Sequence, residues 1–176
     1  MTRSDSRRTF LTSVGVGALW VGCSKPSHSE APRRHDADEN EQEDEVTPAE
    51  DLMREHGVLR RVMYLYDDAA LRLDGNKDLP LDALAGGAAI IRRVIEDYHE
   101  KLEEEFLFPR FEKAGTLVEL VTTLRKQHAT GRTLTEQITT LAKSKLADAD
   151  RAKLAGTLRT FNHMYRPHAA REDTLL

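Results

Sequence analysis

The stretch LAGGAAIIRRVIEDYHEKLEEEF, residues 84–106, decides the fold class of this chain. Its apolar side chains recur every three or four residues, which is the period of an amphipathic α-helix with one buried face. The stripe on that face consists of Leu84, Ala88, Ile91, Ile95, His99, Leu102 and Phe106. A histidine therefore interrupts an otherwise apolar face.

Three other stretches follow the same pattern. Thr47-Pro48-Ala49-Glu50 predicts the start of the first helix, because threonine can cap it, proline suits its first turn and glutamate completes a capping box. Asp74-Gly75-Asn76 predicts its end. The stripes are Leu52, His56, Leu59, Met63, Tyr66, Ala70 and Leu73; Leu117, Leu120, Leu124, His128, Gly131, Thr135, Ile138 and Leu141; and Leu154, Leu158, Phe161, Tyr165, His168 and Glu172. Since short connections favour antiparallel neighbours, we predict an all-α fold, an antiparallel up-down-up-down four-helix bundle.

Composition limits the classes of function. The chain has a formal net charge of -4 and only 6% aromatic residues, so it lacks the basic field that would hold a nucleic acid, and we expect no nucleic-acid partner. Cys23 is the only cysteine, which excludes an intramolecular disulfide and a zinc cluster of several thiolates. Any metal must therefore be held by nitrogen and oxygen atoms.

The beginning of the chain is typical of an export signal. Arg7 and Arg8 precede the uncharged run from Leu11 to Gly22, so residues 1–23 predict a twin-arginine signal peptide. The run ends at Val21-Gly22-Cys23-Ser24, which resembles the cleavage box of bacterial lipoproteins. We expect a periplasmic protein or an envelope lipoprotein tethered to the membrane through a lipidated Cys23; the alternative is a soluble exported protein.

The next segment, residues 24–48, is acidic at seven of the ten positions from Asp36 to Glu45. It has too few large apolar side chains to form a core, so we predict a disordered acidic linker. This linker would connect the signal to a single folded domain over residues 49–176.

Each of the four stripes carries a histidine: His56, His99, His128 and His168. One histidine on such a face is more often a hydrogen-bonded core residue than a metal ligand, but an apolar core has no need of four. Glu103 and Glu172 lie four residues after His99 and His168, and residues at that spacing share one face of a helix. Buried carboxylates without partners are costly, and bound cations would offset that cost.

These groups belong to an internal repeat. Glu55-His56 with Arg60 parallels Gln127-His128 with Arg132, and His99 with Glu103-Glu104 parallels His168 with Glu172-Asp173. A duplicated helical hairpin would place two sets of ligands about a pseudo-twofold axis, so we predict a two-centred metal site. Imidazole and carboxylate ligands suit iron, and also manganese or zinc.

Four strings of residues carry a resemblance to a known family. They are Arg54-Glu55-His56, His99-Glu100-Lys101-Leu102-Glu103-Glu104-Glu105-Phe106-Leu107-Phe108-Pro109, His128, and His168-Ala169-Ala170-Arg171-Glu172-Asp173. They resemble the haemerythrin-like, or HHE cation-binding, domains. The resemblance implies a carboxylate-bridged pair of iron ions: His56 and His99 would hold one ion, His128 and His168 the other, Glu103 and Glu172 would bridge them, and Glu100 could be a further ligand.

The resemblance also implies a function. We expect a non-haem di-iron protein, not an enzyme, whose partner is a small molecule such as dioxygen, nitric oxide or a related oxidant that it binds or senses. The alternatives are a di-iron peroxidase or ferroxidase, or a simple metal-binding or storage bundle. Arg132 stands where oxygen-carrying members have a fifth histidine, so the predicted site is poorer in nitrogen. Members usually continue past the position of Leu176, so we expect a short final helix, with truncation of the sequence as one explanation.

Overall fold

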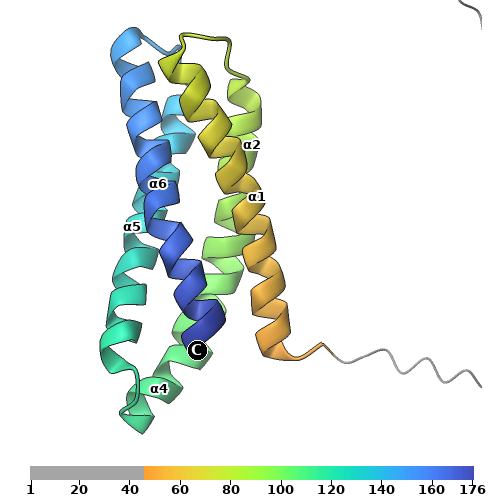
Figure 1. The fold of residues 1–176 in the computed structure, drawn as a ribbon, viewed down its shortest axis with the longest axis vertical. Helices are drawn as coiled ribbons and strands as arrows, with labels where there is room; N and C mark the ends of the chain where they lie inside the picture. The colour runs from red at the N-terminus through yellow and green to blue at the C-terminus, as the bar shows by residue number, and fades with distance from the viewer. Residues whose placement is uncertain (1–45) are drawn as a thin grey trace, which may run out of the picture. The chain divides into compact units, whose positions relative to one another are not determined.

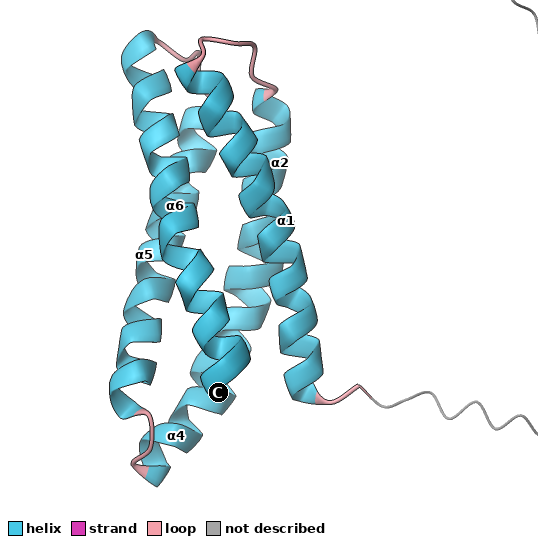
Figure 2. Ribbon diagram, viewed as in Figure 1, coloured by secondary structure: helices cyan, strands magenta, loops and turns pink. Residues whose placement is uncertain are grey.

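The structure is a computed structural model that describes residues 46–176. The predictions for the signal peptide, for Cys23 and for the linker up to Glu45 lie outside the described residues. Within the described residues every regular element is helical and no strand occurs, which confirms the all-α prediction (Figure 2). None of the helices in this part of the chain is both long and apolar enough to cross a membrane.

Helix α1 (Pro48–Asp74) begins and ends where the sequence predicts. The Glu50 backbone N–H donates to the Thr47 hydroxyl at 3.3 Å, and the Thr47 backbone N–H donates to the Glu50 carboxylate at 2.9 Å. This capping box satisfies backbone groups that a helix start leaves without partners. It therefore defines where the first rod of the bundle begins.

The second rod is one continuous run of five helical segments: α2 (Leu81–Ile90), η1 (Ile91–His99), α3 (Glu100–Leu102), η2 (Glu103–Leu107) and α4 (Phe108–Ala114). The two η segments are π-helical: the Glu100 N–H bonds to the carbonyl of Ile95, and the Phe108 N–H to that of Glu103. Such wide turns rotate the residues that follow relative to an α-helix. The prediction that Phe106 lies on the buried stripe is therefore wrong: Phe106 is 58% exposed and Phe108 is fully buried.

The last two rods are α5 (Val118–Ala142) and α6 (Asp148–Leu175). The predicted stripe of α6 is buried throughout. In α5 the prediction fails only at its start, because Leu117 lies outside the helix in a left-handed conformation and is 40% exposed. The prediction of a short final helix is wrong, because α6 has 28 residues, although it ends less than one turn after Glu172.

The rods lie side by side, and α6 packs against both α1 and α5 (Figure 1). The α1–α2 and α5–α6 connections lie at one end of the group of rods, and the α4–α5 connection lies at the other. A large apolar cluster from Leu59 to Ala169 fills most of the interior, and a small one is formed by Phe108, Val121 and Leu124. Between these two clusters along the rods lie the buried histidines, so the polar centre is enclosed by apolar packing.

Candidate metal centre

The structure brings together the four predicted histidines, one from each rod. Their exposed fractions are 2% for His56, 1% for His99, 0% for His128 and 1% for His168. The Nε2 atoms of His56 and His99 are 3.1 Å apart. The rings of His128 and His168 meet edge to face with 5.0 Å between their centroids. Two pairs of imidazoles therefore face one buried volume.

Glu172 lies between the two pairs. Its Oε2 is 3.2 Å from His56 Nε2, and its Oε1 is 3.0 Å from His168 Nε2 and 3.7 Å from His128 Nε2. Two groups that could hold a cation result, one from His56, His99 and Glu172 and one from His128, His168 and Glu172. The two oxygens of one carboxylate thus face different histidine pairs, as a bridging ligand requires.

Glu103, which lies on the second rod whereas Glu172 lies on α6, also contacts both histidine pairs. Its Oε2 is 3.5 Å from His99 Nε2 and 3.5 Å from His128 Nε2. Together Glu103 and Glu172 present oxygens to the same space as the four Nε2 atoms. The predicted set of four histidines and two glutamates is therefore assembled in one place.

The outward-facing nitrogens of the first pair are tied to acids. His56 Nδ1 is 2.6 Å from the Asp173 carboxylate, which also pairs with Arg60. His99 Nδ1 is 2.8 Å from the Glu55 carboxylate. In each pair the imidazole donates its Nδ1 proton to the carboxylate, which leaves the Nε2 lone pair directed at the centre.

The second pair is held in the same way. His128 Nδ1 donates to Glu104 at 2.9 Å, and Arg132 contacts the same carboxylate at 2.8 Å. His168 Nδ1 donates to the amide oxygen of Gln127 at 3.0 Å. Partners of this kind orient metal-ligating histidines and raise their basicity. All four imidazoles are thus prepared in the tautomer that binds a cation through Nε2.

Sequence reasoning missed this outer layer of Glu55, Gln127, Glu104 and Asp173. The three consecutive acids from Glu103 to Glu105 are typical of a solvated face, but the Glu104 side chain is only 25% exposed and is bonded to His128. The signal was available in the internal repeat, because each of these residues directly adjoins a predicted ligand. By contrast, His163 is exposed and does not join the centre.

The buried polar atoms fit a cation better than they fit one another. Among the described residues, Glu103 Oε2, His128 Nε2 and both oxygens of Glu172 have no hydrogen-bond partner. Burial and the charge of Glu172 raise the pKa of Glu103 to about 10. Burial also opposes ionisation of Glu172, yet the neighbouring histidines hold its pKa below the usual range. A set of nitrogen and oxygen donors without other partners, in a buried space, is what divalent first-row metals require.

Glu100 is placed beside this centre but is already engaged. It is fully buried, its Oε1 accepts a hydrogen bond of 2.7 Å from the Tyr165 hydroxyl, and Arg132 lies 3.0 Å from its Oε2. A Cβ on Gly131 would overlap with the Tyr165 hydroxyl, so a glycine is needed there for this contact. Glu100 could also form a cation group with Glu104 and His128. Its role as a ligand stays a prediction.

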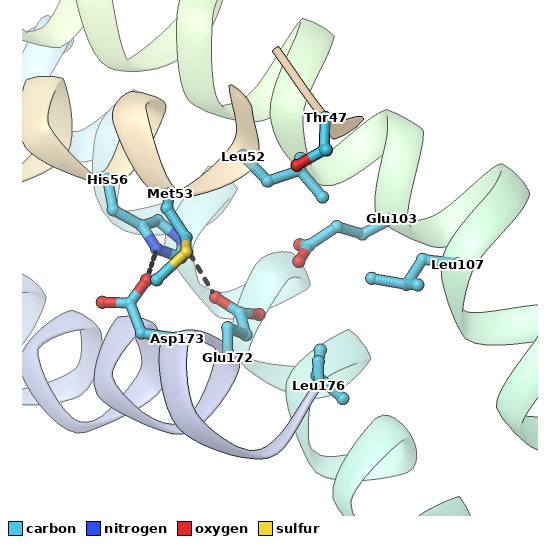
Figure 3. A pocket seen from close by; sticks show the side chains of 9 residues that line it. All are labelled: Thr47, Leu52, Met53, His56, Glu103, Leu107, Glu172, Asp173 and Leu176. Carbon is cyan, nitrogen blue, oxygen red and sulfur yellow. Dashed lines mark hydrogen bonds and ion pairs between the residues drawn. The ribbon is translucent and has the colours of Figure 1, made fainter. Parts of the chain in front are cut away.

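A pocket of about 500 Å³ opens onto one side of the centre (Figure 3). Aliphatic side chains line much of it, and His56, Glu103, Glu172 and Asp173 line its inner part. Among the described histidines of the centre, only His56 reaches this pocket. Phe108 stacks on His128 at 5.5 Å, and Tyr165 meets His168 edge to face at 5.3 Å. The first histidine pair is therefore open to a small molecule, and the second is covered by aromatic rings.

Comparison with known proteins agrees with this geometry. The family model of the hemerythrin HHE cation binding domain matches residues 47–176. Three relatives carry the name uncharacterized protein: one from Mycobacterium bovis and two from strains of Mycobacterium tuberculosis. Each is 39% identical to this chain over 168 residues, which cover 94% of this chain and 66% of the relative. The chain thus spans a little under two thirds of the length of these relatives. No solved structure matches. The chain belongs to the hemerythrin HHE cation-binding family.

Proposed function

We propose that this protein holds two iron ions at the four histidines and uses them to bind or sense dioxygen, nitric oxide or a related small oxidant. His56 and His99 would hold one ion, His128 and His168 the other, and Glu103 and Glu172 would bridge them. The same nitrogen and oxygen donors would also suit manganese or zinc. The bundle that carries these ligands is proposed to be antiparallel, in agreement with the alternate ends at which the connections lie in Figure 1.

One observation carries this proposal: the two oxygens of Glu172 face different histidine pairs, at 3.2 Å from His56 and 3.0 Å from His168. A carboxylate that served one cation would not need imidazoles on both sides. The outer partners of the imidazoles add to the argument, since each accepts the Nδ1 proton and so orients Nε2 toward the centre. A reduced iron pair, when bound, can transfer electrons to a small oxidant.

The residues around the centre have separate tasks. Leu52, Met53 and Leu107 give the pocket an apolar lining. Asp173 and Glu55 hold the Nδ1 protons of the first pair, so these protons are not free to leave. Phe108 and Tyr165 close the second pair. We therefore propose that the oxidant approaches the ion held by His56 and His99.

A di-iron peroxidase or ferroxidase is the second candidate. It is favoured by the carboxylates of Glu100 and Glu104 and the guanidinium of Arg132, which lie together beside the second histidine pair. Burial raises the pKa of Glu100 to about 7, so this carboxyl group could supply a proton during turnover. Reversible binding of dioxygen without consumption of peroxide would support the first candidate, and steady consumption of peroxide would support the second.

The test is anaerobic loading of the purified chain with iron(II), followed by elemental analysis and an absorption spectrum before and after exposure to air. We expect two ions per chain and a spectrum that changes with the oxidant. His56→Gln and His128→Gln should each lose one ion, because each removes a ligand from a different half. A chain that binds no iron, or variants that keep full occupancy, would contradict the proposal.

We also propose, from the sequence alone, that the protein is exported by the twin-arginine route and anchored through Cys23. Fractionation of cells that express the full chain tests this. We expect the protein in the envelope fraction, and Cys23→Ser should release it into the soluble periplasm. Retention in the cytoplasm would contradict export.

A further inference from the structure

A second group of buried polar side chains lies next to the metal centre and outside its proposed ligands. Glu96 of η1 is 3% exposed, and Tyr66 of α1 and Thr135 of α5 are fully buried. The Tyr66 hydroxyl, the Thr135 hydroxyl, both Glu96 oxygens and Glu100 Oε2 have no hydrogen-bond partner within residues 46–176. Such groups are costly to bury; Glu96 Oε2 and Glu100 Oε2 each have a guanidinium nearby, whereas the two hydroxyls have no partner among the described residues.

The internal repeat shows that the bundle does not require polar groups here. In the repeat register set by the histidines, Thr135 corresponds to Met63, and Glu100 corresponds to Ala169. Met63 and Ala169 are both buried apolar residues. The same scaffold positions are thus filled by ordinary core residues between α1 and α6 and by polar residues between the second rod and α5. Thr135 and Glu100 therefore have no polar counterpart in the other half, and packing alone does not explain them.

Each guanidinium on that side is shared between two carboxylates. Arg92 pairs with Glu96 at 2.8 Å and with Glu136 at 3.0 Å, and Arg132 pairs with Glu100 at 3.0 Å and with Glu104 at 2.8 Å. The neutral Tyr66 and Thr135 hydroxyls still lack a hydrogen-bond partner among the described residues. Their partner must be able to donate and to accept a hydrogen bond, and water meets that description.

The groups that face Glu96 agree with a wet site. Burial raises the pKa of Glu96, while the Thr135 hydroxyl, Arg92 and Arg132 lower it and Asp97 raises it. The charge of Glu96 also raises the pKa of the buried Tyr66 and Tyr165 hydroxyls. These groups come from α1, the second rod, α5 and α6, so polar groups on every rod are coupled electrostatically to Glu96.

The polar group extends from the surface toward the centre. At its outer end Arg92 is 39% exposed and pairs at 3.0 Å with Glu136, whose side chain is 67% exposed. At its inner end Glu100 directly follows His99 and accepts the hydrogen bond of Tyr165. Glu96 lies one helical turn before Glu100 on the same rod. Polar side chains thus lie along the second rod from the partly exposed Arg92, through Glu96, to Glu100 beside His99.

We propose that Glu96, Thr135 and Tyr66 bind ordered water, and that this water carries protons from the surface at Arg92 and Glu136 to the metal centre. The inference rests on the proposed function, because reduction of dioxygen or hydrogen peroxide consumes one proton for each electron that the reduced iron pair supplies. A proton passes from solvent water to the Glu96 carboxylate, and from Glu96 through bound water to the reduced oxidant. Glu96 ends in its initial state.

A crystal structure of the iron-loaded chain tests the binding site directly. We expect ordered water within hydrogen-bond distance of Glu96 and of the Thr135 hydroxyl. The Thr135→Val variant, which keeps the shape of the side chain, should lose part of this water. A dry site, or a metal cation bound to Glu96, would overturn the proposal.

Proton uptake tests the role of this water. The reduced, iron-loaded chain is mixed with hydrogen peroxide, and proton uptake is followed with a pH indicator in light and heavy water. Glu96→Gln should slow uptake about tenfold and raise the solvent isotope effect, with iron content unchanged. The matched control is Glu105→Gln, the same substitution on the same rod at an exposed position, which should leave uptake unchanged.

The outcomes separate the two proposals. Unchanged uptake in Glu96→Gln would overturn the proton route and leave the di-iron proposal standing. If Glu96→Gln does not fold, Thr135→Val must show the slowed uptake for the inference to hold. Failure of the unaltered chain to bind iron would instead remove the proposed function itself.

Discussion

The two halves of the bundle carry the same ligands in different surroundings. Each half supplies two histidines and one glutamate, and each imidazole donates its Nδ1 proton to a side chain that adjoins a ligand from the repeat. The half with His56 opens onto a pocket, whereas Phe108 and Tyr165 cover the half with His128 and His168. The symmetric part accounts for the two groups that could hold a cation, and the asymmetric part accounts for the pocket beside only one of them.

The largest effect is expected where the halves share a ligand. Glu172→Gln should reduce iron binding in both halves, because the amide cannot supply an anionic oxygen to each histidine pair. Iron per chain, measured after anaerobic loading, should fall toward zero. Glu105→Gln is the matched control, since that carboxylate is exposed and should not affect binding. Retention of one ion in Glu172→Gln would show that the halves bind independently.

A second test uses the opposite titration of the two bridging carboxylates in the metal-free protein. Burial and the charge of Glu172 raise the pKa of Glu103 from 4.5 to about 10, so its contribution to stability is present below 4.5 and is lost as pH rises toward 10. The free energy of unfolding should therefore fall across this window. Histidine partners hold the pKa of Glu172 below its usual range, despite burial, so its contribution is lost in acid.

Thermal unfolding of the metal-free chain at several pH values measures both effects. Glu103→Gln should flatten the decline in alkaline solution, and Glu172→Gln should flatten the decline in acid. Bound metal should reverse the alkaline trend, because the ligands bind metal in their deprotonated forms. Identical pH profiles in the two variants would show that the carboxylates do not differ.

A smaller effect is expected where one half has a carboxylate and the other an amide as the partner of a histidine Nδ1 atom. His99 donates to the carboxylate of Glu55, and His168 donates to the amide of Gln127. Glu55→Ala should weaken iron binding by about 10- to 100-fold, because the imidazole loses its orienting partner. Glu55→Gln makes the halves alike and should cost much less. A titration with iron(II) measures both, and equal losses in the two variants would mean that charge, not orientation, is what His99 needs.

The smallest effect concerns packing. Gly131→Ala should lower the free energy of unfolding by about 1–3 kcal/mol, because the added Cβ overlaps with the Tyr165 hydroxyl. The corresponding position in the first half is Leu59, where a large side chain is buried. Gly156→Ala is the control: its Cβ would meet nothing within 4 Å, and the exposed helical position should gain stability by about 0.4–1 kcal/mol. Denaturant unfolding measures both variants.

The prediction of the fold from local pattern succeeded where helices are regular. The capping box at Thr47 and the stripe of α6 are where the periodicity predicts, because each depends on residues within a few positions along the chain. The prediction failed at Phe106 and Leu117. Phe106 lies in the π-helical segment η2, and Leu117 has a left-handed conformation just before α5. Neither feature can be recognised from the spacing of apolar residues in the sequence.

What the sequence by itself determined is which residues could meet a metal. Spacing of three and four places His56, His99, His128, His168, Glu103 and Glu172 on buried faces, and their number argues against an ordinary core. What only the tertiary structure decided is the partner of each group. Glu55 bonds to His99 and Tyr165 bonds to Glu100 across 44 and 65 positions of the chain. These contacts depend on how the rods are rotated and staggered against one another, and side-chain packing between rods, not local periodicity, sets that rotation.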